Sequence, residues 1–418
     1  MSPAGPSGTS TPSAEPRGRR PPGRARGLLA YLVVAVLAAA AGVGTTMAVQ
    51  DTGSSRPGAT RMPHEAAVAR PGAMNDDAVY REVEPGIVDV TANLQYREET
   101  AEGTGFVIDA AAGLVLTNNH VIDGATSVTV TPVTSGKSYP ARVLGYDLTD
   151  DLALLQLQGV PGLKAVTFGD SSHVTVGTPV LAIGNEAGQG GSPTVAPGVI
   201  SNLERTIVAS DQSSGLTETL RGMMQTSADI RPGDSGGPLA DAAGRVIGID
   251  TAAGGGTVYS GYAIPINQAL PITRLIAAGH ASPRIQIGLP AFLGVLVPDS
   301  SSTDPRRQAS QELRQTGVVS SSGSGCTSGD TTAIPASVAP ARSGALVDGV
   351  LCGTAAASAG IFAGDVITSI GGRAVTSPGS LTASVSRYRP GSKTPLAWVS
   401  PGGSLHTALV TLNAGPAG

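Results

Sequence analysis

The chain has 418 residues, with 57 glycines, 31 prolines, 3% aromatic residues and a formal net charge of −4. Two folded domains with tails fit this length, and the many turn-forming residues favour short strands over a helical bundle. The small net charge gives no reason to expect a nucleic-acid partner, so we expect a mostly β protein with no nucleic acid among its partners.

The first 50 residues have the composition of a membrane anchor. Residues 1–26 are rich in Pro, Gly, Ser and Arg, which predicts a disordered basic tail. Residues 27–50 carry no charged side chain. The length of this stretch suits a single transmembrane helix. Arginines before this helix predict a cytoplasmic N-terminus and an extracytoplasmic body. A cleaved signal peptide is the alternative, because Ala38–Ala41 offers small residues for cleavage.

Short β-like runs bounded by turn residues fill the region 76–282, which follows a flexible linker at 51–75. Six such runs are 105–108, 113–117, 127–130, 152–157, 179–183 and 245–249. Strands this short and frequent are typical of an all-β barrel or sandwich. Residues 267–278 have near-helical apolar spacing, and Gly279 follows them, so a short helix is predicted. A second domain is predicted at 286–418, with a Ser/Gly-rich loop insertion at about 300–341.

The segment Gly233–Leu239, with the sequence GDSGGPL, is a candidate nucleophile turn centred on Ser235. Amide hydrolysis by a serine needs a base, a carboxylate that orients the base, and backbone donors for the developing oxyanion. Glycines on both sides of Ser235 allow a tight turn that aims N–H groups at one point. We therefore predict an oxyanion hole formed by Gly233, Asp234 and Ser235, with the N–H groups of Gly233 and Ser235 as donors.

His120 is the candidate base, because it follows a predicted strand and precedes the candidate Asp and Ser in the chain. Three aspartates lie at the right place for the carboxylate: Asp147, Asp150 and Asp151. Asp151 directly precedes the apolar run 152–157 and is favoured, with Asp150 as the rival, whereas Asp147 and Asp150 are interpreted as solvated turn residues. The order His, Asp, Ser is that of chymotrypsin-type double barrels, and it differs from the orders in subtilisin and in α/β-hydrolases.

Six sequence blocks resemble those of the HtrA/Deg family of trypsin-like serine proteases. They are Gly103–Ile108 (GTGFVI), Thr117–Ile122 (TNNHVI), Asp151–Leu155 (DLALL), Gln225–Ile230 (QTSADI), Gly233–Leu239 (GDSGGPL) and Tyr262–Pro265 (YAIP). The resemblance implies a chymotrypsin-like double β-barrel followed by a PDZ domain. It also implies cleavage of unfolded or damaged extracytoplasmic proteins as part of protein quality control and the stress response. No cofactor and no metal are expected.

The C-terminal region resembles a PDZ domain of this family in two segments. Phe292, Leu293, Gly294 and Val295 resemble the loop that binds a peptide carboxylate, and 355–372 resembles the helix and strand pair that follow it. Such a domain takes C-terminal peptide tails by adding them to a sheet edge. The two cysteines, Cys326 and Cys352, are expected to form a disulfide in an exported chain, which would tie the insertion to the domain.

Family analogy places Ile230, Thr251, Ala252 and Ala253 around the primary specificity pocket, which implies a small aliphatic residue at the cleavage site. Asp229 argues against this, because it stands six residues before Ser235, where trypsin has its pocket carboxylate. A carboxylate in the pocket would favour cleavage after Arg or Lys. The alternative is that Asp229 pairs with the nearby Arg231.

Two other classes of function remain open at the level of sequence. One is a PDZ-bearing scaffold or chaperone with an idle protease site, which the complete set of catalytic residues disfavours. The other is an esterase, which the absence of a Gly-x-Ser-x-Gly elbow at a strand-to-helix junction disfavours. Family members can also rest with a collapsed oxyanion turn that peptide binding orders, and many are homo-oligomers; the sequence decides neither point.

Overall fold

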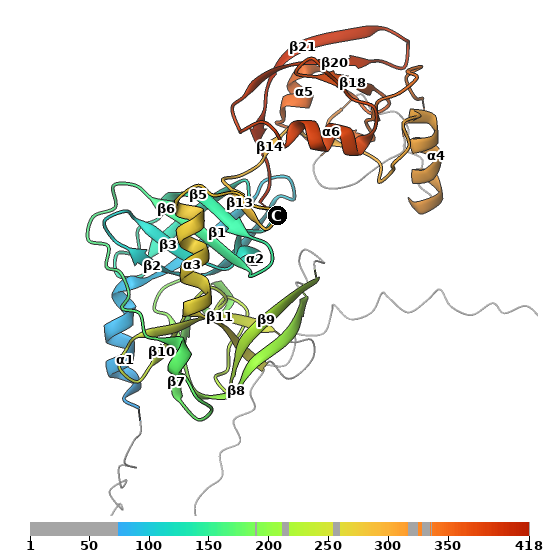
Figure 1. Ribbon diagram of the computed structural model, residues 1–418. Coiled ribbons are helices and arrows are strands. Elements are labelled where there is room, and N and C mark those ends of the chain that lie inside the picture. Colours follow the sequence, from blue (N-terminus) through green and yellow to red (C-terminus); the bar gives the residue numbers. More distant parts are fainter. Residues whose placement is uncertain are drawn as a thin grey trace, which may run out of the picture. The chain divides into compact units, whose positions relative to one another are not determined.

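The computed structural model describes residues 74–417 except 189, 211–216, 254–259, 317–324, 328–334 and 336 (Figure 1). The predicted cytoplasmic tail, the predicted transmembrane segment 27–50 and most of the linker lie outside the described residues. Among the helices within the described ranges, none has the length and apolar character needed to cross a bilayer.

Six antiparallel strands form the first sheet of the protease region. They are β1 (Ile87–Leu94), β2 (Glu99–Asp109), β3 (Leu114–Thr117), β4 (Ser127–Pro132), β5 (Tyr139–Asp147) and β6 (Leu152–Leu157). They follow the order β5-β4-β1-β2-β3-β6, and β5 also pairs with β6, so the six strands close into a ring. A seventh strand, β13 (Ile285–Ile287), pairs with Gly145–Asp147 of β5, beyond the residues that pair with β4. The boundary predicted at 286 therefore falls inside a strand of this sheet.

Six further strands form a second barrel. They are β7 (Pro179–Gly184), β8 (Thr194–Ser210), β9 (Thr217–Thr226), β10 (Pro238–Asp241), β11 (Val246–Ala253) and β12 (Ser260–Pro265). This barrel is closed in the order β10-β11-β12-β9-β8-β7. The mostly β fold predicted from the short apolar runs is confirmed.

Alternation of side chains along the strands explains why this sequence forms barrels. In β4, Val128 and Val130 are buried, whereas Ser127 is exposed and Thr129 is partly exposed. A shift of one residue in register would turn both valines to solvent, so the buried face fixes the register. The strand β6 is buried along nearly its whole length, as expected for its apolar sequence LALLQL.

The α-helices that accompany the barrels, in the part of the chain that the structure describes, are α1 (Asp76–Val83), α2 (Asn119–Ile122) and α3 (Ile266–Ala277). The side chain of Asn75 caps α1 by accepting a hydrogen bond from the N–H of Ala78. The helix predicted at 267–278 is confirmed as α3, which lies against strands of both barrels (Figure 1). Short 3-10 helices occur at Glu84–Gly86, Ser171–His173 and Glu186–Gly188.

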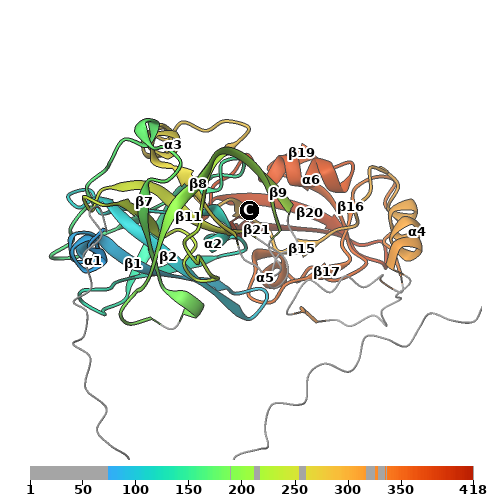
Figure 2. The same ribbon diagram turned by 90° about the horizontal axis from the view of Figure 1, so that it is seen from below.

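The described residues of the C-terminal region form small sheets and three helices. Its strands are β14 (Ala291–Phe292), β15 (Val295–Leu296), β16 (Ala345–Leu346), β17 (Gly349–Val350), β18 (Val366–Ile370), β19 (Arg373–Ala374), β20 (Lys393–Val399), β21 (Leu405–Thr411) and β22 (Asn413–Ala414). The main sheet has the order β16-β18-β20-β21, with β19 beside β18 (Figures 1 and 2). The helices are α4 (Pro305–Thr316), α5 (Ala355–Ala359) and α6 (Pro378–Val385).

The segment at 300–341, predicted to be a loop, contains helix α4. Asp304 precedes the helix and accepts a hydrogen bond from the N–H of Arg306, and Pro305 occupies the first turn, where proline is tolerated. Gln308 is buried and donates to the carbonyl oxygens of Ser302 and Gly344 at 2.8 Å each. A polar side chain, rather than an apolar stripe, therefore anchors this helix, which is why apolar spacing did not reveal it.

Candidate active site

Asp151 holds His120 through both of its carboxylate oxygens. Oδ2 of Asp151 lies 2.8 Å from Nδ1 of His120, and Oδ1 accepts the backbone N–H of His120 at 2.9 Å. His120 lies in α2, just after β3, whereas Asp151 directly precedes β6, and strands β3 and β6 are neighbours in the sheet. Asp151 is 1% exposed, so this carboxylate acts on the imidazole without competition from bulk water.

The backbone at Asp151 is held in a left-handed conformation, with φ of 51°. Such a φ is uncommon outside glycine and costs about 1 to 3 kcal/mol, so it persists only where neighbouring groups hold it. The amide of Asn118 supplies one such contact, donating from Nδ2 to the carbonyl of Asp151 at 2.8 Å. Oδ1 of Asn118 accepts from the hydroxyl of Thr251 at 3.3 Å, which ties this corner of the first sheet to β11 of the second barrel.

The other two candidate aspartates occupy different environments from those expected. Asp147, interpreted from sequence as a solvated turn residue, is fully buried; its Oδ1 accepts the N–H groups of Thr149 and Asp150. The side chain of Asp150 is 15% exposed and binds Gln268 at 2.8 Å and Arg284 at 3.0 Å. The interpretation was wrong because partners distant in sequence, on α3 and beside β13, cover this turn. Of the three aspartates, Asp151 is the one for which the structure describes hydrogen bonds with His120.

Ser235 lies in a turn of the second barrel, between β9 and β10, and is 7% exposed. Gly233 has φ of 99° and Gly236 has φ of 86°, conformations that glycine adopts without a steric penalty. The carbonyl of Asp234 accepts the N–H of Gly237 at 2.9 Å. The N–H of Asp234 itself donates to the carbonyl of Arg231 at 3.0 Å, so this residue of the predicted oxyanion hole directs its N–H elsewhere.

Two buried carboxyl groups lie at this turn: that of Asp234, within the turn, and that of Asp250, in β11. Asp234 accepts the N–H of Arg231 at 2.9 Å and the hydroxyl of Thr194 at 3.3 Å, while burial raises its pKa to about 6. Asp250 is fully buried, and burial together with the nearby Asp234 raises its pKa well above the usual range. The backbone of Asp250 also pairs with the turn, because its carbonyl accepts the N–H of Gly236 and its N–H donates to Gly237.

Asp229 pairs with Arg231, which was the alternative to a pocket carboxylate. Nε and Nη2 of Arg231 donate to Oδ2 of Asp229 at 3.0 and 2.6 Å, and Nη1 bonds to Glu186. The Asp229 side chain is 60% exposed. Ile230 is fully buried in the apolar cluster of the second barrel, and Thr251 is buried beside Asn118. Ala252 and Ala253 continue β11, where Ala252 pairs with Gly261.

The predicted carboxylate-binding loop joins two short strands of the C-terminal region. Phe292 ends β14 and Val295 begins β15, while Gly294 has φ of 84°. The carbonyl of Leu293 accepts the N–H of Ala356, and that of Gly294 accepts the N–H of Leu351, each at 2.9 Å. The loop is thus fixed to the segment that enters α5.

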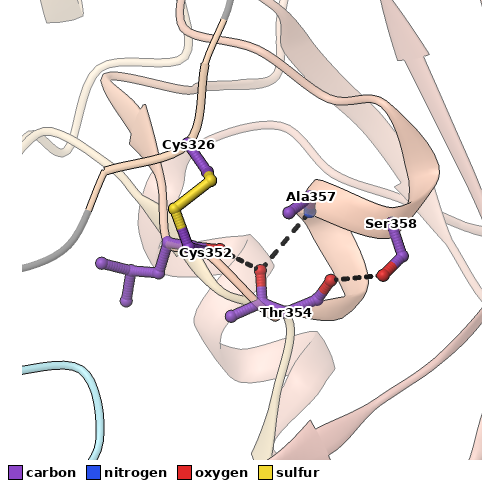
Figure 3. Close-up of a disulfide and its surroundings, with 6 residues drawn as sticks. Cys326, Cys352, Thr354, Ala357 and Ser358 are labelled. Atoms are coloured by element: carbon purple, nitrogen blue, oxygen red, sulfur yellow. Dashed lines mark hydrogen bonds between the residues drawn. A yellow bond between two sulfur atoms is a disulfide. The ribbon is translucent and has the colours of Figure 1, made fainter.

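A disulfide joins Cys326 and Cys352 beside the start of α5 (Figure 3). Thr354 caps this helix: its hydroxyl donates to the carbonyl of Leu351 at 2.6 Å and accepts the N–H of Ala357 at 3.4 Å. Within the described part of the chain, no three His, Cys, Asp or Glu side chains are grouped as they would be around a metal ion.

Residues 103–249 match the family model of the trypsin-like peptidase domain. Over 94% of its length the chain is 31% identical to the serine protease PepD of Mycobacterium tuberculosis, of which the match covers 80%. It is 34% identical to the periplasmic serine endoprotease DegP of Escherichia coli and 37% identical to the serine protease Do-like HtrB of Bacillus subtilis. These two matches cover 75% and 55% of this chain, and 58% and 52% of the relatives.

The fold and the peptidase-domain match define a trypsin-like serine protease. The extended similarity to PepD, together with DegP and HtrB, shows that the chain belongs to the HtrA/Deg family of these enzymes.

Proposed function

We propose that this serine protease cuts polypeptides with a triad of His120, Asp151 and Ser235. The observation that carries the proposal is the pair of hydrogen bonds that the Asp151 carboxylate accepts from His120, which fixes the ring with Nδ1 toward the carboxylate. Nε2 is then the nitrogen left to act as the base. In this arrangement Asp151 also stabilises the imidazolium that forms during the reaction.

The reaction has two halves. Nε2 of His120 takes the proton of the Ser235 hydroxyl while Oγ attacks the scissile carbonyl, and the N–H groups of Gly233 and Ser235 receive the oxyanion. The imidazolium then gives its proton to the leaving nitrogen as the C–N bond breaks. In the second half, water attacks the acyl ester, its proton passes to His120, and Ser235 leaves with that proton restored.

The proposed substrates are unfolded or damaged polypeptides outside the cytoplasm. Support comes from DegP, whose name places that relative in the periplasm. In this proposal, residues 27–50 anchor the chain in the cell membrane by a single helix, with its N-terminus in the cytoplasm. The primary specificity pocket, bordered by Ile230 and Thr251–Ala253, takes a small aliphatic residue, because Arg231 engages the carboxylate of Asp229.

The C-terminal region is proposed to act as a PDZ domain that binds C-terminal peptide tails and thereby recruits substrates or regulates the site. The positive φ of Gly294 and the fixed carbonyls of Leu293 and Gly294 support this role. These two carbonyls accept the N–H groups of Ala356 and Leu351. The N–H groups of the loop are then the groups that would donate to the carboxylate of a bound peptide.

Hydrolysis of an unfolded protein, such as reduced casein, tests the proposal. The purified chain should degrade it without ATP, and Ser235→Ala should not. If the chain binds C-terminal peptides but hydrolyses nothing, with or without added peptide, the idle scaffold is the correct reading.

A further inference from the structure

Thr104 connects the first barrel to the nucleophile turn through both its side chain and its backbone. It lies in β2 and is fully buried. Its hydroxyl donates to the carbonyl of Gly233 at 2.7 Å, and its N–H donates to the carbonyl of Ser235 at 2.9 Å. The residues it binds are 129 and 131 positions further along the chain, in the second barrel.

These two bonds fix alternate peptide groups of the turn. The hydroxyl bond holds the peptide group between Gly233 and Asp234, whose N–H donates to Arg231. The backbone bond holds the peptide group between Ser235 and Gly236, whose N–H donates to Asp250. The proposed oxyanion donors, the N–H groups of Gly233 and Ser235, belong to the two peptide groups that alternate with these. Their direction therefore depends on the planes that Thr104 holds.

The proton of the Thr104 hydroxyl has a defined direction. The backbone N–H of Asn185 donates to this oxygen at 2.9 Å, and an N–H can only donate, so the hydroxyl must direct its own proton to another acceptor. The carbonyl of Gly233 is that acceptor. Asn185 is itself held, because its Oδ1 accepts the N–H of Gly190 at 3.0 Å.

Close packing on the other side of the turn restricts alternative positions. A Cβ atom at Gly236 would lie 2.1 Å from the carbonyl oxygen of Thr104, so the turn contacts the backbone of β2 directly. The carbonyl of Thr104 in turn accepts the hydroxyl of Thr117 at 2.6 Å. The turn therefore packs directly against β2. The hydroxyl of Thr104 fixes the orientation of the Gly233 carbonyl within that turn.

We propose that Thr104 is a positioning residue that holds the oxyanion-binding turn in its hydrolytic conformation. The inference rests on the proposed triad mechanism, because it assigns a role in that same site. Valine has the shape of threonine but would leave the carbonyl of Gly233 and the N–H of Asn185 without their partner. Gly233, which has no side chain to restrict it, would then be free to rotate away from the oxyanion.

The test compares Thr104→Val and Thr104→Ser with the wild type and with the control Thr131→Val. Thr131 lies in β4 of the same sheet, and its hydroxyl bonds only to Ser138 among the described contacts. Removing a direct oxyanion donor costs about 10² to 10³ in kcat, so we expect Thr104→Val to lose about 10- to 100-fold in kcat. KM should stay within about threefold, and Thr104→Ser should recover most of the activity.

Binding of a peptidyl aldehyde separates positioning from general damage. The aldehyde forms a tetrahedral adduct with its oxygen in the oxyanion hole, so its affinity for Thr104→Val should fall in parallel with kcat/KM. The pH profile of kcat/KM should keep its apparent pKa, because the hydrogen bonds between His120 and Asp151 do not involve Thr104. Rates are expressed per folded molecule, and Thr104→Ala replaces Thr104→Val if the latter does not fold.

The inference fails if Thr104→Val keeps wild-type kcat and aldehyde affinity, or if Thr104→Ser is as impaired as Thr104→Val. It also fails if the loss of activity in Thr104→Val is fully accounted for by a smaller fraction of folded protein. Failure of the proposed function looks different, since the wild type itself would then hydrolyse no peptide.

Discussion

His120 and the carboxylate of Asp151 are joined by two hydrogen bonds, one from the imidazole ring at 2.8 Å and one from the backbone N–H at 2.9 Å. The second bond means that Asp151 places the whole residue as well as its ring. Asp151 can do so because its own backbone adopts a left-handed conformation held by Asn118.

Replacing Asp151 with Asn should lower kcat by about 10⁴, because an amide that accepts from the backbone N–H presents its NH₂ group to the ring and favours the wrong tautomer. The matched control is Asp150→Asn, one residue earlier, which should stay within about threefold of wild type. Steady-state hydrolysis of a chromogenic peptide measures both variants. Equal losses, or a larger loss at Asp150, would exclude Asp151 as the orienting carboxylate.

Replacing Asp229 with Asn should leave the preference at the cleavage site unchanged. Arg231 binds the Asp229 carboxylate, and the side chain is largely exposed, so it offers little attraction to a substrate cation. A peptide library varied at the residue before the cleaved bond should show small aliphatic residues preferred in both proteins, with rates within about threefold. A wild-type preference for Arg or Lys that disappears in Asp229→Asn would contradict this prediction.

Asp348 should make the C-terminal region less stable as the pH rises. Its side chain is buried, and both carboxylate oxygens lack a hydrogen-bond partner among the residues that the structure describes. Burial together with nearby Glu312 raises its pKa from 3.8 to about 8. Between these values the folded chain keeps a proton that the unfolded chain releases, so the free energy of unfolding falls with increasing pH. Below the lower value both states are protonated and the penalty is absent.

Asp348→Asn removes this titration. The free energy of unfolding of the variant, minus that of the wild type, should therefore increase by about 1 kcal/mol for each unit of increasing pH between pH 5 and 7. Urea unfolding can be followed by the fluorescence of Trp398, the single tryptophan, which is buried in the C-terminal region. Asp299→Asn, an exposed position before α4, is the control and should show no such trend. Parallel pH curves for Asp348→Asn and wild type would contradict the assignment.

Removing the disulfide should destabilise the C-terminal region while sparing the protease site. The two cysteines are separated by 26 positions in sequence, and for a loop of that length the chain-entropy model gives about 3.5 kcal/mol. The double variant Cys326→Ser, Cys352→Ser should therefore unfold at lower urea when followed by Trp398. Hydrolysis of a short peptide that does not engage the C-terminal region should stay within about twofold; unchanged unfolding would show that the bond contributes little.

Local patterns in the sequence were sufficient to predict the barrel strands β2, β3, β4, β6, β7 and β11, and helix α3. Val128 and Val130 alternate with polar residues, and the run at 152–157 is apolar, so burial follows directly from sequence. The short 3-10 and α-helical turns were not predicted, and His120, expected at the end of a strand, lies in the four-residue helix α2. Its position is set by Asp151, which is 31 residues away in sequence.

The residues that sequence reasoning missed are those whose role depends on distant partners. Thr104 was noted only within a family-like block, because nothing near it in sequence indicates that Gly233 would lie against its hydroxyl. Asn118 was missed for the same reason, since its contacts with Asp151 and Thr251 join different parts of the chain. Asp147 was misread because its burial depends on the barrel closing around it.

The most direct test of the central claim is active-site labelling of the intact protein with a peptidyl phosphonate, followed by mass spectrometry of the labelled peptide. We expect a single adduct on Ser235, no adduct in Ser235→Ala, and a fall in peptide hydrolysis of about 10⁶ in that variant. An adduct on a different serine, or hydrolysis by Ser235→Ala at the wild-type rate, would contradict the assignment of Ser235 as the nucleophile.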